Sequence, residues 1–457
     1  MQIECKKFLI IGAGPTALGA AYRLQEMGEN DFLLCEKEKY VGGLSTSFVD
    51  AEGFTWDVGG HVQFSHYSYF DQVMRNCLGD AWFLHERESW VWIFNRFIPY
   101  PLQNNIHRLP DLDMQNALSD LKKCTQRQHP LPDNFEQWIK LSFGQHISNI
   151  FMLPYNFKVW ATPLDKMSYQ WIGERVSTVD LQKIQENIKN NSDDRNWGPN
   201  NKFQFPKVGG TGAIWTACAQ LLAPGHINLD THLIKVDLKE KTATFKQMGK
   251  IVCYKYQHLL STIPLKVLAQ MCQGMPTETQ ALAQNLEHST THVFGIGLKG
   301  QAPSALNKKC WMYFPQDDCP FYRVTVFSHY SPHNVPDAQT DWSLMAEVSE
   351  SRHKPVNRQT ILAQVIQGML KTKLILRQED IISTWHHTAP FGYPIPTLDR
   401  DKILSQVLPL LHSAEVYSRG RFGGWKYEVS NQDHSFMQGV EWAEYKVLGT
   451  PEKTFHL

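Results

Sequence analysis

The feature that most constrains the fold is a glycine-rich turn near the N-terminus. Residues 8–11 are a short apolar run typical of a strand, and Gly12 and Gly14 follow at once, with the small Ala17 three residues later. Gly12 permits a tight turn, Gly14 lets a pyrophosphate approach the backbone, and Ala17 allows close packing of helix against strand. The pattern therefore predicts a dinucleotide site at a helix N-terminus, where unpaired N–H groups attract phosphate.

A second strand and an acidic residue complete this unit. Residues 31–35 predict a strand that ends at Glu36, where a carboxylate accepts hydrogen bonds from a ribose. Strand, helix and strand in this order imply a parallel sheet. The glycine pair that follows brings another loop to the pyrophosphate and favours FAD over NAD. The cofactor residues predicted there are Gly43, Leu44 and Ser45.

The rest of the chain predicts two further regions. Residues 105–200 are mostly helical in pattern, and residues 242–264 predict a hairpin that turns near Gly249. The alternating run 227–236 resembles a strand beside adenine, with Leu233 as a candidate contact. Strand-like runs at 293–298, 311–314, 322–327 and 342–348 indicate an antiparallel sheet.

We therefore predict an α/β protein with a Rossmann-like FAD-binding domain, a helical domain and an antiparallel-sheet domain. The FAD-binding domain is expected to be discontinuous, because later strands return to it. The expected segments are 1–100, 202–265 and 380–457 for the FAD-binding domain, 101–201 for the helical domain and 266–379 for the sheet domain.

Charge and cysteine usage narrow the classes of partner. The 457 residues carry 45 basic and 45 acidic side chains, so a surface for nucleic acid or anionic membrane is not expected. The nine cysteines contain no C-x-x-C pair, which favours reduced thiols in a cytoplasmic protein and no metal site. The uncharged run 8–22 is too short and too rich in glycine to span a bilayer.

Several further stretches match one family in order. They are 58–62, 64–67, 87–92, 99–106, 155–160, 173–176, 209–212, 321–323, 392–394, 420–423 and 431–435. The most specific are Gly-Gly-His at 59–61, Gly-Glu-Arg-Val at 173–176 and Asn-Gln-Asp-His-Ser at 431–435. Together they resemble the UDP-galactopyranose mutases of the eukaryotic type, from about residue 8 to 445.

This resemblance implies a redox-neutral use of FAD. In that family, N(5) of the reduced flavin attacks the anomeric carbon of galactose and displaces UDP. The flavin–sugar adduct opens, recloses as a five-membered ring and is recaptured by UDP, which interconverts UDP-galactopyranose and UDP-galactofuranose. Only reduced flavin has the required electron pair, so a reductant such as NADPH is implied. A homo-oligomer is a possible assembly.

Two arginines carry the substrate chemistry that the resemblance implies. A UDP-sugar has a charged diphosphate, and guanidinium groups bind phosphate bidentately and stay charged. Arg175 and Arg323 match the diphosphate clamp of the family. The uridine, diphosphate and sugar contacts implied beside them are Tyr100, Gln103, Asn156, Trp160, Asn200, Trp311, Tyr313, Tyr330, Tyr393 and Tyr427. Each of these aromatics is also a candidate for ordinary core packing.

The flavin end of the site has its own matched residues. His61 follows a glycine pair that lets the backbone approach the flavin ring, and its expected role is to order and sense the flavin rather than to act as an acid or base. A helix beginning near His434 would favour negative charge on the reduced ring. The other residues matched to the flavin are Gly60, Arg421, Asn431, Gln432 and Ser435.

Three positions depart from the family pattern, namely Leu102, His329 and His333, where phenylalanine, asparagine and tyrosine are expected. They leave open a related mutase for another nucleotide sugar. An FAD oxidase or dehydrogenase of the amine-oxidase-like class shares the glycine motifs, but its substrates have no diphosphate for Arg175 and Arg323. A non-catalytic nucleotide-sugar binding protein that retains FAD is a third interpretation.

Overall fold

The structure is a computed structural model that describes residues 3–126, 131–195, 198 and 201–456. It begins with the predicted unit: strand β1 (Ile3–Ile11), helix α1 (Pro15–Glu26) and strand β2 (Phe32–Cys35). β1 is five residues longer at its start than the predicted strand, because residues 3–7 extend its pairing with a later strand. β1 and β2 are parallel, which confirms the predicted sheet type.

The first sheet has the order β13-β10-β11-β12-β1-β2-β9, and β19 pairs with β12. Leu9 and Ile11 of β1 face one core, whereas Phe8 and Ile10 face the other, so this sheet is covered on both sides. The predicted hairpin turns at Gly249, which has a φ of 83°. The remaining strands are β9 (Ile227–Asn228), β10 (Thr231–Asp237), β11 (Thr242–Gln247), β12 (Lys250–Ser261), β13 (Cys272–Gln273) and β19 (Val416–Ser418).

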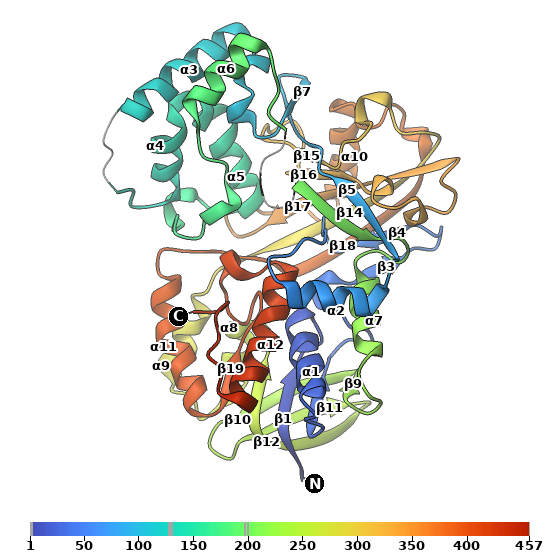
Figure 1. Cartoon of the computed structure of the whole chain (residues 1–457), viewed down its shortest axis with the longest axis vertical. Helices are drawn as coiled ribbons and strands as arrows, with labels where there is room; N and C mark the ends of the chain where they lie inside the picture. Colours follow the sequence, from blue (N-terminus) through green and yellow to red (C-terminus); the bar gives the residue numbers. More distant parts are fainter. Residues whose placement is uncertain (1–2, 127–130, 196–197, 199–200, 457) are drawn as a thin grey trace.

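Two groups of helices cover this sheet, in the lower part of Figure 1. With α1 lie α2 (Ser68–Leu78), α7 (Gly212–Gln220) and α12 (Gln432–Leu448), and on the opposite face lie α8 (Leu265–Met271), α9 (Thr277–Gln284) and α11 (Arg400–Ser413). α12 begins two residues before the predicted start near His434, since Asn431 already takes the N-cap position.

Close crossing of α1 and α12 depends on glycine. A Cβ atom on Gly439 would lie 1.9 Å from the carbonyl oxygen of Thr16, and one on Gly19 would lie 2.4 Å from that of Phe436. Only residues without a side chain allow two backbones to approach so closely. The crossing holds α12 against the helix that follows the glycine turn.

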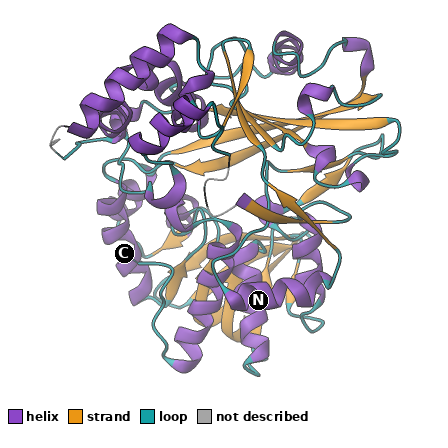
Figure 2. Cartoon of the chain, turned by 45° about the horizontal axis from the view of Figure 1, so that its top comes forward, coloured by secondary structure: helices purple, strands orange, loops and turns teal. Residues whose placement is uncertain are grey.

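The second sheet has the order β18-β14-β17-β16-β15-β6-β7 and is antiparallel except where β15 pairs with β6. Figure 2 shows its long strands crossing above the first sheet. The four predicted strand-like runs all lie in it. Its strands are β6 (Ser89–Ile93), β7 (Arg96–Pro99), β14 (His288–Lys299), β15 (Trp311–Tyr313), β16 (Arg323–Val326), β17 (Asp341–Glu350) and β18 (Ile381–Pro394).

Strand pairing therefore assigns residues 89–99 and 381–394 to the second sheet, although both lie in segments predicted for the FAD-binding domain. The division into three domains stays a prediction. Helix α10 (Ile361–Lys371) packs on this sheet. Two small antiparallel pairs complete the strands, β3 (Ser47–Val49) with β4 (Thr55–Asp57) and β5 (Trp82–Glu86) with β8 (Lys202–Pro206).

A helical layer is formed by residues 111–126 and 135–190, at the upper left of Figure 1. The side chain of Asn134 accepts a hydrogen bond from the backbone N–H of Gln137 and so caps the N-terminus of the second of these helices. Across the described ranges, no helix combines the length and the apolar character needed to cross a bilayer. The helices are α3 (Asp111–Gln126), α4 (Phe135–Ile147), α5 (Leu153–Trp160) and α6 (Leu181–Asn190).

Candidate functional site

A cavity of about 1060 Å³ lies where the three parts of the fold meet. Its walls come from the carboxyl ends of β1, β2 and β12, from the 58–62 loop, from α5 and from the second sheet. In α/β proteins, ligands bind at the carboxyl ends of the parallel strands. The predicted site residues in its lining are Gly12, Gly14, Glu36, Gly43, Leu44, Ser45, Gly60, His61, Tyr100, Gln103, Asn156, Trp160, Arg175, Leu233, Trp311, Tyr313, Arg323, Tyr393, Arg421, Tyr427, Asn431, Gln432 and Ser435.

Two predicted site residues that the structure describes lie outside the cavity lining. Ala17 is fully buried in α1 behind the turn, where the fingerprint needs a small packing residue. Tyr330 is not in the cavity lining, because its ring is buried among Phe203 and Phe205. Asn200 lies outside the described residues.

The glycine turn has the geometry that a pyrophosphate requires. Gly12 has a φ of 103°, and a Cβ atom there would lie 2.2 Å from Oγ1 of Thr262. A Cβ atom on Gly43 would lie 3.3 Å from the Cα atom of Gly14, so the two glycine loops meet backbone to backbone. Gly14 is the N-cap of α1 and provides no capping side chain, which leaves the helix N-terminus open to an anion.

Glu36 lies beside this turn at the end of β2. Its carboxylate accepts hydrogen bonds from the backbone N–H groups of Ala13, at 2.7 Å, and Glu38, at 2.9 Å. Burial raises the pKa of Glu36, and these two hydrogen bonds oppose that rise. The carboxylate is thereby fixed at the cavity wall, at the predicted ribose position. These features together fit the adenosine diphosphate half of FAD.

Gly12→Ala is expected to abolish FAD binding, because a side chain at this position would require both a strained φ and displacement of Thr262. Gly28→Ala is the matched control, since Gly28 has a φ of 79° but no atom within 4 Å of its Cβ position. The control should lose only about 1 kcal/mol of stability and keep its flavin. Flavin absorbance of the purified variants measures the difference, and equal FAD content in both would contradict the role given to Gly12.

Arg323 is joined to an acid that the sequence analysis did not single out. Its Nε and Nη2 atoms donate hydrogen bonds to the two carboxylate oxygens of Glu347, at 2.9 and 2.8 Å. Glu347 also accepts hydrogen bonds from the Tyr322 hydroxyl, at 2.6 Å, and from the backbone N–H of Gly60, at 2.9 Å. The pair therefore links β16 and β17 to the glycine pair before His61.

Both members of this pair stay ionised. Burial alone would lower the pKa of Arg323, but the Glu347 carboxylate raises it well above its ordinary value. Burial opposes ionisation of Glu347, but Arg323 and the hydroxyl of Tyr322 hold its pKa below the ordinary value. The sequence did contain a sign that Glu347 matters: it is an acidic residue inside the apolar run 342–348, and a buried carboxylate requires a partner.

Two other arginines border the cavity without a carboxylate partner among the described residues. The Nη2 atom of Arg175 donates to the backbone carbonyl of Glu428, and its guanidinium lies 5.7 Å from the centre of the Tyr427 ring. Arg421 donates to the carbonyl of Gly392 at 3.1 Å and to the hydroxyl of Ser430 at 3.1 Å. Carbonyl and hydroxyl partners leave both positive charges uncompensated in the cavity wall.

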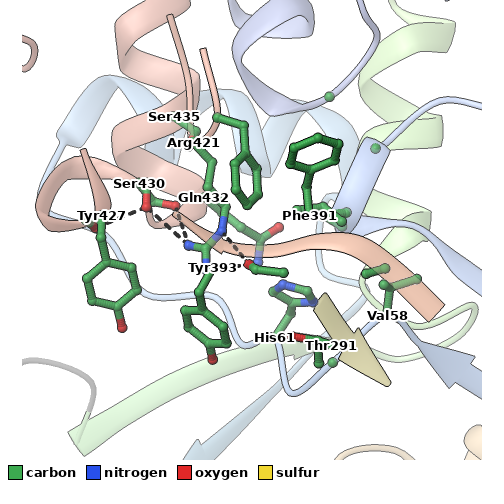
Figure 3. Close-up of a pocket in the computed structure, with 18 of the residues that line it drawn as sticks. Val58, His61, Thr291, Phe391, Tyr393, Arg421, Tyr427, Ser430, Gln432 and Ser435 are labelled. Carbon is green, nitrogen blue, oxygen red and sulfur yellow. Dashed lines mark hydrogen bonds between the residues drawn. The ribbon is translucent and has the colours of Figure 1, made fainter. Parts of the chain in front are cut away.

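Figure 3 shows the flavin end of the cavity. The guanidinium of Arg421 lies among Ser430, Gln432 and His61, with the rings of Tyr393 and Tyr427 alongside. The centre of the Tyr393 ring is 5.0 Å from the Arg421 guanidinium carbon. The arrangement places a fixed positive charge beside the N-terminus of α12, as expected for a site that accommodates a negatively charged ring.

His61 is held neutral. Burial lowers its pKa to about 4, the Glu347 carboxylate opposes this change, and the charges of Arg421 and Arg323 reinforce it. Its Nδ1 atom is buried and has no hydrogen-bond partner in the described structure. An imidazole with a free ring nitrogen beside the glycine pair fits the predicted role of ordering a flavin.

Aromatic rings line the opposite end of the cavity. Tyr313 contacts Tyr100 and Tyr155 edge-on, with ring centres 5.1 and 5.4 Å apart, and Trp160 contacts Tyr427 at 4.9 Å. Tyr155, Tyr322 and Arg87 also line the cavity; the sequence analysis included them in stretches that match the family but gave them no role in the site.

Two amides lie at this end. Gln103 donates to the carbonyl of Ser177 at 2.8 Å, while its Oε1 atom is buried without a partner in the part of the chain that the structure describes. Asn156 donates to the carbonyl of Met152 at 2.7 Å, which leaves its oxygen as an acceptor. Rings to stack on and amides to read polar edges suit a nucleobase.

The three departures from the family pattern lie off the cavity lining. Leu102 is fully buried in the core of the helical layer. His329 lies 3.3 Å from the carbonyl oxygen of Lys309, and His333 follows it in a short helical turn. None of the three is among the described residues that line the cavity, so they do not alter its chemistry directly.

Comparison with known proteins agrees with this geometry. The family of NAD(P)-binding Rossmann-like domains matches residues 10–77. A crystal structure of reduced UDP-galactopyranose mutase superimposes with a TM-score of 0.94 at 48% identity, over 99% of this chain and 96% of the other. The chain belongs to the UDP-galactopyranose mutase family.

The mutase family assignment confirms the resemblance and the predicted α/β fold class. Two other crystal structures share the fold alone. A putative protoporphyrinogen oxidase from Exiguobacterium sp. 255-15 has a TM-score of 0.71 at 14% identity, over 98% of this chain and 100% of that one. A fatty acid isomerase from P. acnes has a TM-score of 0.65 at 12% identity, over 97% of this chain and 99% of that one.

Proposed function

We propose that this chain binds FAD and, when the flavin is reduced, interconverts UDP-galactopyranose and UDP-galactofuranose. The observation that carries the proposal is one continuous cavity that joins the glycine turn to the arginine pair Arg175 and Arg323 and to the aromatic end. When bound and reduced, FAD supplies N(5) as the nucleophile for covalent catalysis at the anomeric carbon.

The residues of the chain have separable tasks in this proposal. Arg175 and Arg323 hold the charge of the diphosphate as it leaves the sugar and retain UDP for its return. Tyr100, Gln103 and Asn156 bind and orient the uridine. Holding the departed UDP in place makes recapture effectively unimolecular, which favours return of the same nucleotide over loss to solvent.

Tyr393 and Tyr427 would border the sugar and the diphosphate between these two ends. Their hydroxyls can bind phosphate oxygens without adding charge. Burial raises the pKa of Tyr393, so it stays a hydrogen-bond donor at neutral pH. The neutral His61 then faces the flavin without adding a second positive charge beside Arg421.

The remaining parts of the proposal concern the reductant and the compartment. NADPH is the expected electron donor, by the resemblance to the family. Buried cysteines such as Cys35, Cys272 and Cys319 are free thiols in the structure, which fits a reducing compartment such as the cytoplasm.

A panel of nucleotide sugars tests the proposal. FAD-loaded protein is reduced with dithionite without oxygen and incubated with UDP-galactose, UDP-glucose, GDP-mannose and dTDP-galactose. We expect conversion of UDP-galactopyranose to the furanose form, measured by chromatography, and at least about 100-fold slower reaction of sugars with another base, since the buried amides would lose their partners. Conversion of none of the four sugars would contradict the proposal. If another nucleotide sugar reacted faster than UDP-galactose, that sugar would be the substrate in place of UDP-galactose.

A further inference from the structure

Three metal-ligating side chains meet next to the cavity, outside the residues given roles above, and one of them, Asp433, is among the residues that line it. His66 follows the 58–62 loop, and Asp433 and His434 lie in the first turn of α12. One ligand atom from each lies within 4.8 Å of those of the other two. The two imidazole centres are 4.9 Å apart. The two parts of this cluster are 367 residues apart in sequence, so no motif reveals it.

The contacts within the cluster leave buried polar atoms unsatisfied. Nδ1 of His66 lies 2.7 Å from Oδ2 of Asp433, whose side chain is 1% exposed. Nδ1 of His434 lies 3.1 Å from the other oxygen, Oδ1, at ion-pair distance, but both atoms are buried and neither has a hydrogen-bond partner among the residues described. A buried polar atom without a hydrogen bond destabilises the folded protein, so an occupant that satisfies both atoms is favoured.

We propose that His66, Asp433 and His434 bind one divalent transition-metal ion of the zinc type. Two imidazoles and one carboxylate form the nitrogen and oxygen set that such ions prefer, with a fourth position for water. Magnesium and calcium are disfavoured because they require mostly oxygen ligands. Ligand atoms around tetrahedral zinc are about 3.4 Å apart. Here the three ligand atoms lie within 4.8 Å of one another, and the His66 side chain, which is 29% exposed, would have to rotate for them to surround one ion.

An ion at this position would join two walls of the cavity. His66 continues the segment that carries His61, while Asp433 lies between Gln432 and Ser435, which line the flavin end. The positive end of the α12 dipole disfavours a cation, and the negative charge of Asp433 offsets it. Metal binding should therefore tie the loop to the helix and raise the melting temperature of the protein.

Metal binding by the intact FAD-loaded protein tests the proposal without any measurement of turnover. Protein stripped with EDTA is titrated with Zn²⁺ by calorimetry and with Co²⁺ by visible absorption. We expect one ion per chain, bound at least about tenfold more weakly in His66→Gln and in His434→Gln, because a lost ligand or ligand partner typically costs 10- to 100-fold in affinity. Added Mg²⁺ should not displace Zn²⁺ or Co²⁺ from the site.

His146→Gln is the matched control, because His146 forms a similar pair with Asp113 at 3.0 Å but is part of no three-ligand cluster within the described ranges. It should bind the ion as the parent does. Zn²⁺ should also raise the melting temperature of the unmodified protein, which needs no variant to fold. Absent or non-stoichiometric binding, or equal affinity in all three variants, would overturn the proposal.

Discussion

Arg323→Ala is expected to reduce turnover by at least about 1,000-fold while the purified protein keeps its FAD. The loss follows from removal of a buried, charge-assisted diphosphate contact, and about 4 kcal/mol of lost transition-state stabilisation corresponds to that factor. Arg323 lies in the lining at the second sheet, whereas Gly12 and Gly14 lie at the position proposed for the pyrophosphate of FAD. Turnover of reduced protein and flavin absorbance, measured on the same preparation, separate the two effects.

Arg323→Ala is also expected to destabilise the protein, and a further variant is needed to separate this effect from the loss of turnover. Glu347 is 2% exposed, and loss of Arg323 leaves its charge without its main partner, which costs about 3–5 kcal/mol of stability. The double variant Arg323→Met with Glu347→Gln removes both charges at similar volume. We expect it to recover most of the melting temperature but none of the turnover.

Arg419→Met provides the matched control for a broken ion pair. Arg419 is 3% exposed and donates to both oxygens of Glu452, at 2.7 and 2.6 Å, but it does not line the cavity. This variant should lose stability and keep turnover. Recovery of turnover in the double variant at Arg323, or loss of FAD from it, would show that the arginine has a structural role only.

The parts of the site that residue spacing predicted without the family resemblance are those whose geometry is local. Gly12, Gly14 and Glu36 lie within one strand–helix–strand unit, so the spacing along the chain fixes their positions in space. The predicted sheet strands were found for the same reason, because alternation and apolar runs are local signals. The added length of β1 was missed since it depends on pairing with β12, far along the chain.

The parts that sequence alone could not predict depend on contacts between distant segments. Glu347 opposes Arg323 only because β16 and β17 pair in one register. Tyr330 matched the family pattern, yet its ring is packed against Phe203 of a different sheet. Leu102, His329 and His333 depart from the family pattern, but only the structure shows that they lie off the cavity lining.

The oxidation state of the flavin is expected to control activity completely. Oxidised protein should convert UDP-galactose at least about 100-fold more slowly than the same protein after reduction, because only reduced flavin has the electron pair that the proposed covalent step uses. The interconversion changes no oxidation state overall, so the electrons are not consumed. One equivalent of dithionite, added without oxygen, should therefore support many turnovers.

This ratio of turnovers to electrons decides between the mutase and an amine-oxidase-like enzyme that shares the fold. An oxidase or dehydrogenase consumes or releases two electrons in every cycle, so its product cannot exceed the added reductant or oxidant. The Gly12→Ala protein, expected to lack FAD, is the control for flavin-independent conversion. Equal activity of oxidised and reduced protein would exclude the covalent mechanism, whereas product limited to the reductant added would exclude a redox-neutral reaction altogether.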